Sequence, residues 1–395
     1  MSRVCAAAAE MTYTTDERDD SGTSRGRMDR VYFLHVWALM VAGIVFVFSA
    51  SFPKAGRPDA LLLPGNPYHY LWQHSAFVAI ALGVMLLASF VPAKWLRKSA
   101  WPLFVGGLLL IALTLLSPWG VKLGGARRWL DLPGLPMFQP SELMKIAFIL
   151  LLAHLIAKKD EGTNESWVAL GWAMFVTLAM GIILLLQRDQ GMATIYSAIA
   201  FSMLFFSGMA LWKLVSLSLG TMSVGLLIAH SEPYRWRRIM AFLDPENAPP
   251  DDRYHILNML IAQARGGVRG MGLGMGEDKW HSLPAAHTDS IFSVIGCETG
   301  LIGGLVVLTA MALLTWRGLQ IARGSDGAFG FYAAAGVSAM LCVQSLAHIA
   351  VNTSCMPVTG LTLPFISGGG TSLISAAVAA GIVLAVSRHR RAGET

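Results

Sequence analysis

The chain of 395 residues is 54% hydrophobic and only 14% charged, with a formal net charge of +6. Soluble globular domains carry about a quarter charged residues, so this composition excludes an ordinary soluble protein and indicates a membrane protein. The positive charge is modest and spread over short polar segments, which is typical of membrane topology and predicts no nucleic-acid partner. The four cysteines have no CxxC or Cys/His spacing, so we expect neither a disulfide framework nor a metal site built on them.

Residues 1–30 are polar and lack the apolar core of a cleavable signal, so we predict a disordered tail. Ten apolar runs follow, each of a length suited to crossing a bilayer as a helix. They cover residues 31–52, 70–91, 101–117, 141–157, 167–186, 191–209, 211–230, 289–316, 329–351 and 371–387. The predicted fold is therefore an all-α polytopic membrane protein with about ten transmembrane helices. One membrane domain covers 31–388, and a short tail covers 389–395.

The orientation follows from the short polar segments, because Lys and Arg are enriched on the cytoplasmic side. The side that carries the N-terminal tail holds the larger share of these residues, and an even number of spans puts both termini there. We therefore predict that both termini are cytoplasmic. The long segment 231–288, between the seventh and eighth predicted helices, then faces outward as an extracytoplasmic loop.

Asp289 ends this polar segment, at the mouth of the eighth apolar run. A carboxylate at a membrane boundary is costly unless it is solvated, paired or chemically employed. One interpretation is that Asp289 caps the helix that follows. The alternative is that Thr288 caps this helix, which leaves Asp289 for chemistry beside His287.

Charged side chains also mark the segment before the fourth apolar run. Arg128 and Trp129 suit either an interfacial membrane anchor or a site in which the guanidinium group binds a pyrophosphate. Glu142 and Lys145 lie one helical turn apart inside an apolar run, where a charged pair faces the interior or a cavity. We regard both as candidates for substrate binding.

Two further polar stretches and a glycine run have structural and functional interpretations. Asp189 lies in a very short turn, where a structural role is slightly favoured over a head-group contact. Arg235 and Arg238 lie in an amphipathic stretch that suits either anionic membrane lipid or a pyrophosphate. The glycines of 266–276 follow no strand, so they predict flexible backbone and no dinucleotide site.

The last polar stretch, 352–372, holds no Lys, Arg, Asp or Glu and is rich in turn residues, Ser367 among them. It is either a re-entrant segment that lines a cavity or an ordinary short loop.

Together these motifs, in this order, resemble the FtsW/RodA (SEDS) family over about residues 31–388. The resemblance rests on His287-Thr288-Asp289-Ser290-Ile291-Phe292, Gly124-Gly125-Ala126-Arg127-Arg128-Trp129, Gln139-Pro140-Ser141-Glu142 with Lys145, Pro233-Tyr234-Arg235 with Arg238, and Leu363-Pro364-Phe365-Ile366-Ser367. The chain departs from the family pattern at Arg188, His255, Asn258, Ala285, Cys297, His348 and Gly368.

The resemblance implies polymerisation of lipid II, the undecaprenyl-pyrophosphate-linked disaccharide peptide, at the outer face of the bacterial cytoplasmic membrane. Asp289 would be the general base of an inverting glycosyl transfer. The other residues would bind substrate: Arg128, Trp129, Glu142, Lys145, Asp189, Arg235, Arg238, His287 and Ser367. A divalent cation, magnesium or manganese, would be possible, although no carboxylate cluster for it is evident.

The implied partners, besides lipid II and membrane lipid, are a class B penicillin-binding protein and divisome membrane proteins. The stretch from Gly360 to Pro364 and the charged tail favour a division role over an elongation role. Two alternatives stay open, a lipid II flippase and an inactive scaffold that recruits a transpeptidase.

Overall fold

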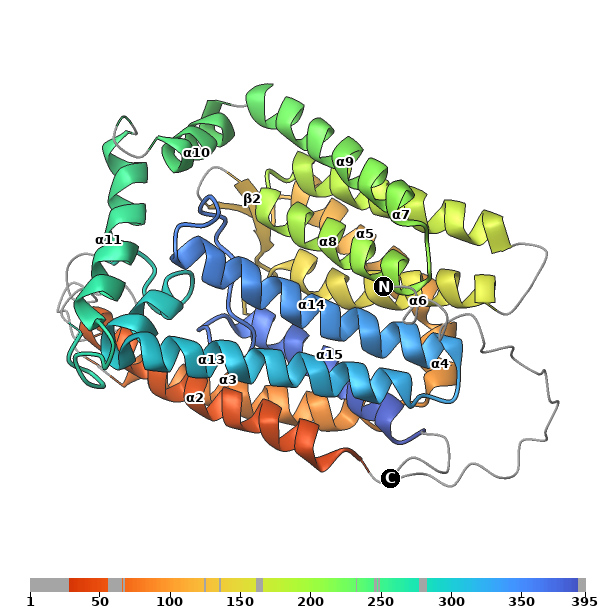
Figure 1. The fold of residues 1–395 in the computed structure, drawn as a ribbon, viewed down its shortest axis with the longest axis horizontal. Helices are drawn as coiled ribbons and strands as arrows, with labels where there is room; N and C mark the ends of the chain where they lie inside the picture. The colour runs from red at the N-terminus through yellow and green to blue at the C-terminus, as the bar shows by residue number, and fades with distance from the viewer. Residues whose placement is uncertain are drawn as a thin grey trace.

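The computed structural model describes residues 28–55, 66, 68–123, 126–134, 136–160, 166–231, 233–244, 247, 249–276 and 283–389. Long helices packed side by side make up the fold (Figure 1). Ten of them coincide with the ten predicted runs: α2 (Arg30–Ala55), α3 (His69–Ala88), α5 (Ala100–Leu116), α6 (Pro140–Asp160), α7 (Ser166–Leu186), α8 (Gln190–Phe206), α9 (Leu211–Ser231), α13 (Ile291–Arg323), α14 (Ala328–Asn352) and α15 (Gly370–Ser387). The predicted N-terminal tail, except 28–30, and residues 390–395 lie outside the described part of the chain.

Among the described helices, α2, α3, α6, α7, α13, α14 and α15 are long and apolar enough to cross a membrane, and α5 and α8 are shorter apolar helices. The start of α2 and the end of α15 lie together, since the amide of Asp29 donates to Ser387 Oγ at 3.1 Å. Arg317, near the end of α13, pairs with Asp29 at 2.8 Å. The two described ends of the chain therefore share one end of the bundle, as the prediction required. That this end is cytoplasmic stays a prediction.

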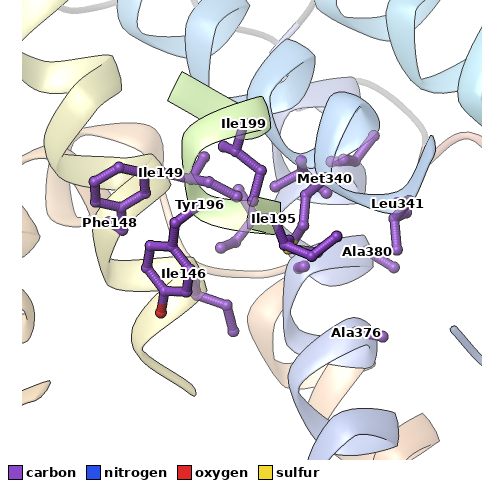
Figure 2. Close-up of a cluster of buried hydrophobic side chains, with 14 of the residues drawn as sticks. Ile146, Phe148, Ile149, Ile195, Tyr196, Ile199, Met340, Leu341, Ala376 and Ala380 are labelled. Atoms are coloured by element: carbon purple, nitrogen blue, oxygen red, sulfur yellow. The ribbon is translucent and has the colours of Figure 1, made fainter. Parts of the chain in front are cut away.

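The centre of the bundle is α6, which is mostly apolar and almost entirely buried. Figure 2 shows side chains of α6, α8, α14 and α15 gathered in one buried cluster, with Phe148 of α6 beside Tyr196 of α8. The Tyr196 hydroxyl donates to the backbone oxygen of Ser141 at 2.8 Å, which pins α8 to the start of α6. By contrast, α2 and α3 expose much of their apolar surface, as helices that face lipid do.

Two features of the polar segments add detail to the predicted fold. The segment 231–288 is not only a loop, because it contains α10 (Pro233–Leu243) and α11 (Pro250–Gly266). Between α5 and α6, the strands β1 (Gly120–Leu123) and β2 (Ala126–Leu130) form an antiparallel hairpin. Its strands carry residues that favour β structure, such as Val121, which pairs with Trp129. The rest of the described chain contains no further strand, and a short α4 (Ala93–Lys98) precedes α5.

The glycine run 266–276 is held in place, although the sequence predicted flexible backbone. The position of this run is explained by a break in α13, where Gly300 adopts the non-helical angles φ 67° and ψ −165°. A break leaves backbone groups on both sides without partners inside the helix. The glycine run supplies them: Met271 N donates to Cys297 O at 3.0 Å, and Leu301 N donates to Gly267 O at 2.9 Å.

We expect Gly270→Ala to destabilise the protein by roughly 1–3 kcal/mol, because Gly270 has φ 83° and an added Cβ would overlap the carbonyl oxygen of Glu298. Gly274→Ala is the matched control, since Gly274 has φ 81° but an added Cβ there meets nothing. Thermal unfolding of both variants in detergent measures the difference. Equal melting temperatures would show that close packing against α13 contributes nothing.

Candidate active site

Asp289 lies in the turn that precedes α13, and its carboxylate does not cap that helix. The N-cap residue of α13 is Ser290, whose own side chain makes no capping hydrogen bond; in the first turn, Ser293 N donates to Asn352 Oδ1 at 3.2 Å. The hydroxyl of Ser290 donates instead to Pro284 O at 2.9 Å, and that of Thr288 lies 3.3 Å from Ala285 O. Neither of the two capping arrangements considered from the sequence is therefore present, and the half-buried Asp289 carboxylate is left for other interactions.

Burial raises the pKa of Asp289 from 3.8 to about 6. A hydrogen bond from Thr288 and the charges of Arg238 and Arg128 act in the opposite direction on this pKa. A carboxyl group with a pKa near 6 is mostly ionised at neutral pH and still basic enough to accept a proton from a hydroxyl. Its environment is therefore that of a general base.

The two arginines reach Asp289 from different parts of the chain. Arg238 lies on α10, and its Nη1 donates to the backbone oxygen of Val358 at 3.0 Å. Arg128 lies on β2, and its Nη2 donates to the backbone oxygen of Arg188 in the turn between α7 and α8. Both guanidinium groups are held by backbone carbonyls, which fixes their positive charge near the Asp289 carboxylate.

Asp189 has a clear structural role in this turn. It is the N-cap of α8, where its Oδ1 accepts from Met192 N at 3.2 Å. Its Oδ2 accepts from Gln139 Nε2 at 3.1 Å and lies 3.6 Å from Arg128 Nε. Burial raises the pKa of Asp189, and the charge of Arg128 lowers it. The structural interpretation favoured from the sequence fits these contacts, which orient Arg128.

The stretch 353–369 folds back into the protein against the Asp289 turn, as a re-entrant segment does. The Ser367 hydroxyl donates to Thr288 O at 2.9 Å and accepts from Leu363 N at 2.8 Å. Gly360, at φ 70°, comes so close that an added Cβ would lie 3.6 Å from Asp289 Oδ2. Ser367 is 3% exposed and positions the Asp289 turn through backbone groups. Its predicted contact with substrate stays a prediction.

A polar network that the sequence motifs did not predict lies behind Asp289. Asn352 Nδ2 donates to Asp289 O at 2.9 Å, and Asn352 Oδ1 accepts from the Ser293 hydroxyl at 2.9 Å. His348 Nδ1 lies 2.7 Å from Leu361 O, and its Nε2 lies 3.3 Å from Asn352 Nδ2. The network fixes the end of α14 to the start of α13. The signal available in the sequence was the one-turn spacing of His348 and Asn352 in an apolar helix.

Glu142 and Lys145 form a buried ion pair at 2.7 Å, with side chains 7% and 2% exposed. Lys145 Nζ also donates to Gln344 Oε1 at 2.6 Å, and Gln344 Nε2 donates to Thr362 O at 3.0 Å. The pair therefore connects α6 through α14 to the re-entrant segment. The predicted pairing and burial are present. These contacts favour a structural role for the pair, and direct contact with substrate is an alternative that is tested by substitution below.

The remaining predicted residues are placed at the edge of this site or outside the described part. Trp129 is half-buried on β2. The ring of His287 lies 5.2 Å from that of Tyr70, and His287 O accepts from Gly368 N at 2.8 Å. The side chain of Arg235 lies outside the described residues.

In the described part of the chain, no three His, Cys, Asp or Glu side chains are grouped so that they could hold a metal ion. The positive charge at the site comes from Arg128 and Arg238. A divalent cation therefore stays a prediction without a set of protein ligands.

Comparison with known proteins identifies the family. Residues 29–392 match the FtsW/RodA/SpoVE family, which is described as cell cycle proteins. The chain belongs to this family. It is 34% identical to a probable peptidoglycan glycosyltransferase FtsW of Idiomarina loihiensis, over 92% of this chain and 88% of that protein. It is 35% identical to a protein of the same description from Geobacter sulfurreducens, over 91% of this chain and 95% of that one.

Solved structures of related proteins have the same fold. A chain in a structure titled "Structural coordination of polymerization and crosslinking by a peptidoglycan synthase complex" superimposes with a TM-score of 0.71 and 28% identity, covering 91% of this chain and 98% of that one. The Thermus thermophilus rod shape determining protein RodA superimposes with a TM-score of 0.68 and 27% identity, covering 92% and 97%. The predicted family and the polytopic helical fold are thus confirmed.

Proposed function

We propose that this FtsW-like chain is a peptidoglycan glycosyltransferase that polymerises lipid II into glycan strands during cell division. The observation that carries the proposal is the Asp289 carboxylate, with a pKa raised to about 6 and two backbone-held arginines, Arg128 and Arg238, facing it. Inverting glycosyl transfer needs both parts, a base for the acceptor hydroxyl and positive charge for an anionic leaving group. The names of the relatives, which describe peptidoglycan glycosyltransferases, support the same activity.

In the proposed reaction the 4-hydroxyl of GlcNAc on one lipid II attacks the anomeric carbon of MurNAc at the end of a growing strand. A bond forms from the 4-oxygen to the anomeric carbon as the bond to the pyrophosphate breaks, which converts an α link into a β-1,4 link. Asp289 takes the hydroxyl proton. Undecaprenyl pyrophosphate leaves with the electron pair.

Arg128 is suited to the leaving pyrophosphate. Its buried Nε lies 3.6 Å from the Asp189 carboxylate, while the side chain as a whole is 26% exposed, so other N–H groups of the guanidinium can meet a ligand. A guanidinium with a donor to spare can form two parallel hydrogen bonds with a phosphate. Arg238 adds a second positive charge from α10. We assign Trp129, at the edge of the site, to positioning a sugar or the lipid stem.

We expect Arg128→Ala to slow polymerisation by about 10²–10³-fold, the usual loss for a group that stabilises charge in the transition state. Arg128→Lys should lose less, because the charge remains and only the planar donor geometry is lost. Both rates are measured with purified, folded protein and lipid II. If Arg128→Ala retained wild-type activity, the pyrophosphate role would be contradicted, and the alternative role of Arg128 as an interfacial membrane anchor would stand.

Reconstitution separates the proposed enzyme from its rivals. Purified protein in vesicles receives lipid II on the leaflet that faces the Asp289 end, and polymer and translocated lipid II are measured together. Polymer without translocation supports the enzyme, and translocation without polymer supports a flippase. Absence of both, with or without a penicillin-binding protein, would support an inactive scaffold.

The solved synthase complex is a precedent for a partner that crosslinks the strands. We therefore propose a class B penicillin-binding protein and further divisome membrane proteins as partners, in a bacterial inner membrane. Copurification with the full-length partner, followed by the polymerisation assay, tests whether activity depends on it.

A further inference from the structure

A cationic pocket lies next to the active site, where the β1–β2 hairpin meets the turn between α7 and α8. Its volume is about 290 Å³. It is lined by Leu115, Lys122, Arg127, Leu186, Gln187 and Arg188. Side chains alternate between the two faces of a strand, so neighbouring residues of β2 serve different sites: Arg127 lines this pocket, whereas Arg128 pairs with Asp189.

The polar lining of the pocket suits an anion. Three of its side chains are cations and none is a carboxylate. Arg127 Nη1 donates to the backbone oxygen of Leu115 at 3.2 Å, which holds its guanidinium group at the pocket wall. A guanidinium group has five N–H donors, so this bond leaves others for a ligand. Phosphate oxygens are the acceptors that such a group of Lys and Arg binds best.

The pocket also contains a buried acceptor. Gln187 is 2% exposed, and among the described residues its Oε1 has no hydrogen-bond partner. A buried amide oxygen without a donor destabilises the folded protein. A ligand that carries a hydroxyl group next to its phosphate would supply the donor that Gln187 lacks. Inorganic phosphate would bind the cations, but it has no separate hydroxyl group that could reach Gln187 Oε1 at the same time.

The surroundings of the pocket are apolar and exposed. Leu186, which lines the pocket, and Leu116, Trp119 and Leu123, which lie between the end of α5 and the end of β1, all expose large parts of their side chains. In addition, a shallow apolar face of α5 extends from Gly106 to Ser117 and reaches the same end of that helix. A tryptophan and leucines at a membrane boundary contact lipid head groups and acyl chains. These apolar surroundings favour a lipid over a water-soluble anion as the ligand of this pocket.

We propose that this pocket binds the head group of an anionic glycerophospholipid that carries a head-group hydroxyl, such as phosphatidylglycerol. Its phosphate lies between Lys122, Arg127 and Arg188, and a glycerol hydroxyl donates to Gln187 Oε1. Its acyl chains lie against the exposed leucines at the end of α5. The site is distinct from the one that we assign to lipid II, and its occupancy does not depend on catalysis.

A lipid bound here acts on the turn that holds Arg128. Arg188 contributes its side chain to the pocket and its backbone oxygen to Arg128. It does so with φ 61°, in the left-handed region, which is unfavourable for a residue with a side chain. A phosphate bound to the Arg188 side chain stabilises this conformation and with it the position of Arg128.

Binding is tested on the full-length protein, delipidated and placed in nanodiscs of phosphatidylcholine with increasing phosphatidylglycerol. Native mass spectrometry counts the retained phosphatidylglycerol. We expect Lys122→Gln/Arg127→Gln to weaken its binding by about 30-fold, since each basic residue near an anionic head group contributes about fivefold. Arg269→Gln, which removes an exposed cation from the glycine run, is the matched control and should bind as wild type does. Equal binding by the double variant and wild type would overturn the proposal.

Further arms identify the ligand. Gln187→Leu should weaken binding of phosphatidylglycerol but not of phosphatidylmethanol, which has the phosphate but no head-group hydroxyl; an equal effect on both lipids would overturn the role of Gln187. Displacement of phosphatidylglycerol by millimolar inorganic phosphate would make this a free-phosphate site and overturn the lipid assignment. Preferential retention of undecaprenyl phosphate would overturn it as well, because the pocket would then belong to the substrate lipid.

Discussion

Asp289→Asn is expected to slow lipid II polymerisation by about 10²–10⁴-fold, the usual cost of losing a general base. The amide has the shape of the carboxyl group but cannot accept the hydroxyl proton. Since the carboxylate does not cap α13, the substitution removes no helix cap. Asp131→Asn, on an exposed residue next to β2, is the control for a carboxylate-to-amide change and should retain wild-type activity.

The stability of Asp289→Asn separates a catalytic loss from a folding defect. The folded-state pKa of Asp289 is about 6, above its ordinary 3.8, so the ionised carboxylate is destabilising in the folded protein. The protonated carboxyl group, by contrast, favours the folded state. This favourable contribution to stability is complete below pH 3.8 and is lost as the pH rises through 6. At pH 7.5 the Asn variant should therefore melt no lower than wild type. An inactive variant with a lower melting temperature would not support the role as a base, and nor would a stable variant with near-wild-type turnover.

The same pKa predicts the pH dependence of the wild-type rate. The base must be ionised, so the rate should fall by half near pH 6 and to about a tenth near pH 5. A profile that is flat down to pH 5, with lipid II binding unchanged, would contradict this assignment.

Most of the helices could be predicted from the sequence because a bilayer demands about 20 apolar residues for each crossing. Asp289 could be singled out because an acidic residue at the membrane boundary requires an explanation. What surrounds it could not be predicted, because the contacts join segments far apart in the chain. Arg128 is held by the carbonyl of Arg188, and Arg238 by that of Val358.

Two features of the fold could not be predicted from the sequence. The glycines of 266–276 indicate conformational freedom, but they do not show that their backbone supplies hydrogen-bond partners at the break that Gly300 makes in α13. Composition cannot show where a helix is interrupted, or which other segment of the chain supplies hydrogen-bond partners at the interruption. The hairpin at 120–130 is too short to leave a periodic pattern among much longer apolar runs.

Lys145→Met should destabilise the protein by about 3–5 kcal/mol, because it leaves Glu142 charged and buried without its partner. It also removes the bond to Gln344, which connects α14 to the re-entrant segment at Thr362. The expected result is a large drop in melting temperature, measured in detergent, together with loss of polymerisation.

The double variant Glu142→Gln/Lys145→Met decides what the pair contributes. Replacing both members of a buried ion pair by neutral side chains of similar size is often nearly neutral for stability. Because both side chains are buried and connect α6 to the re-entrant segment, we expect the double variant to regain most of the melting temperature and most of the activity. A double variant as stable as wild type but inactive would contradict this structural role. Such a variant would fold normally and would lack only the two charges of the pair. Its inactivity would therefore indicate that the pair acts on the lipid II pyrophosphate directly.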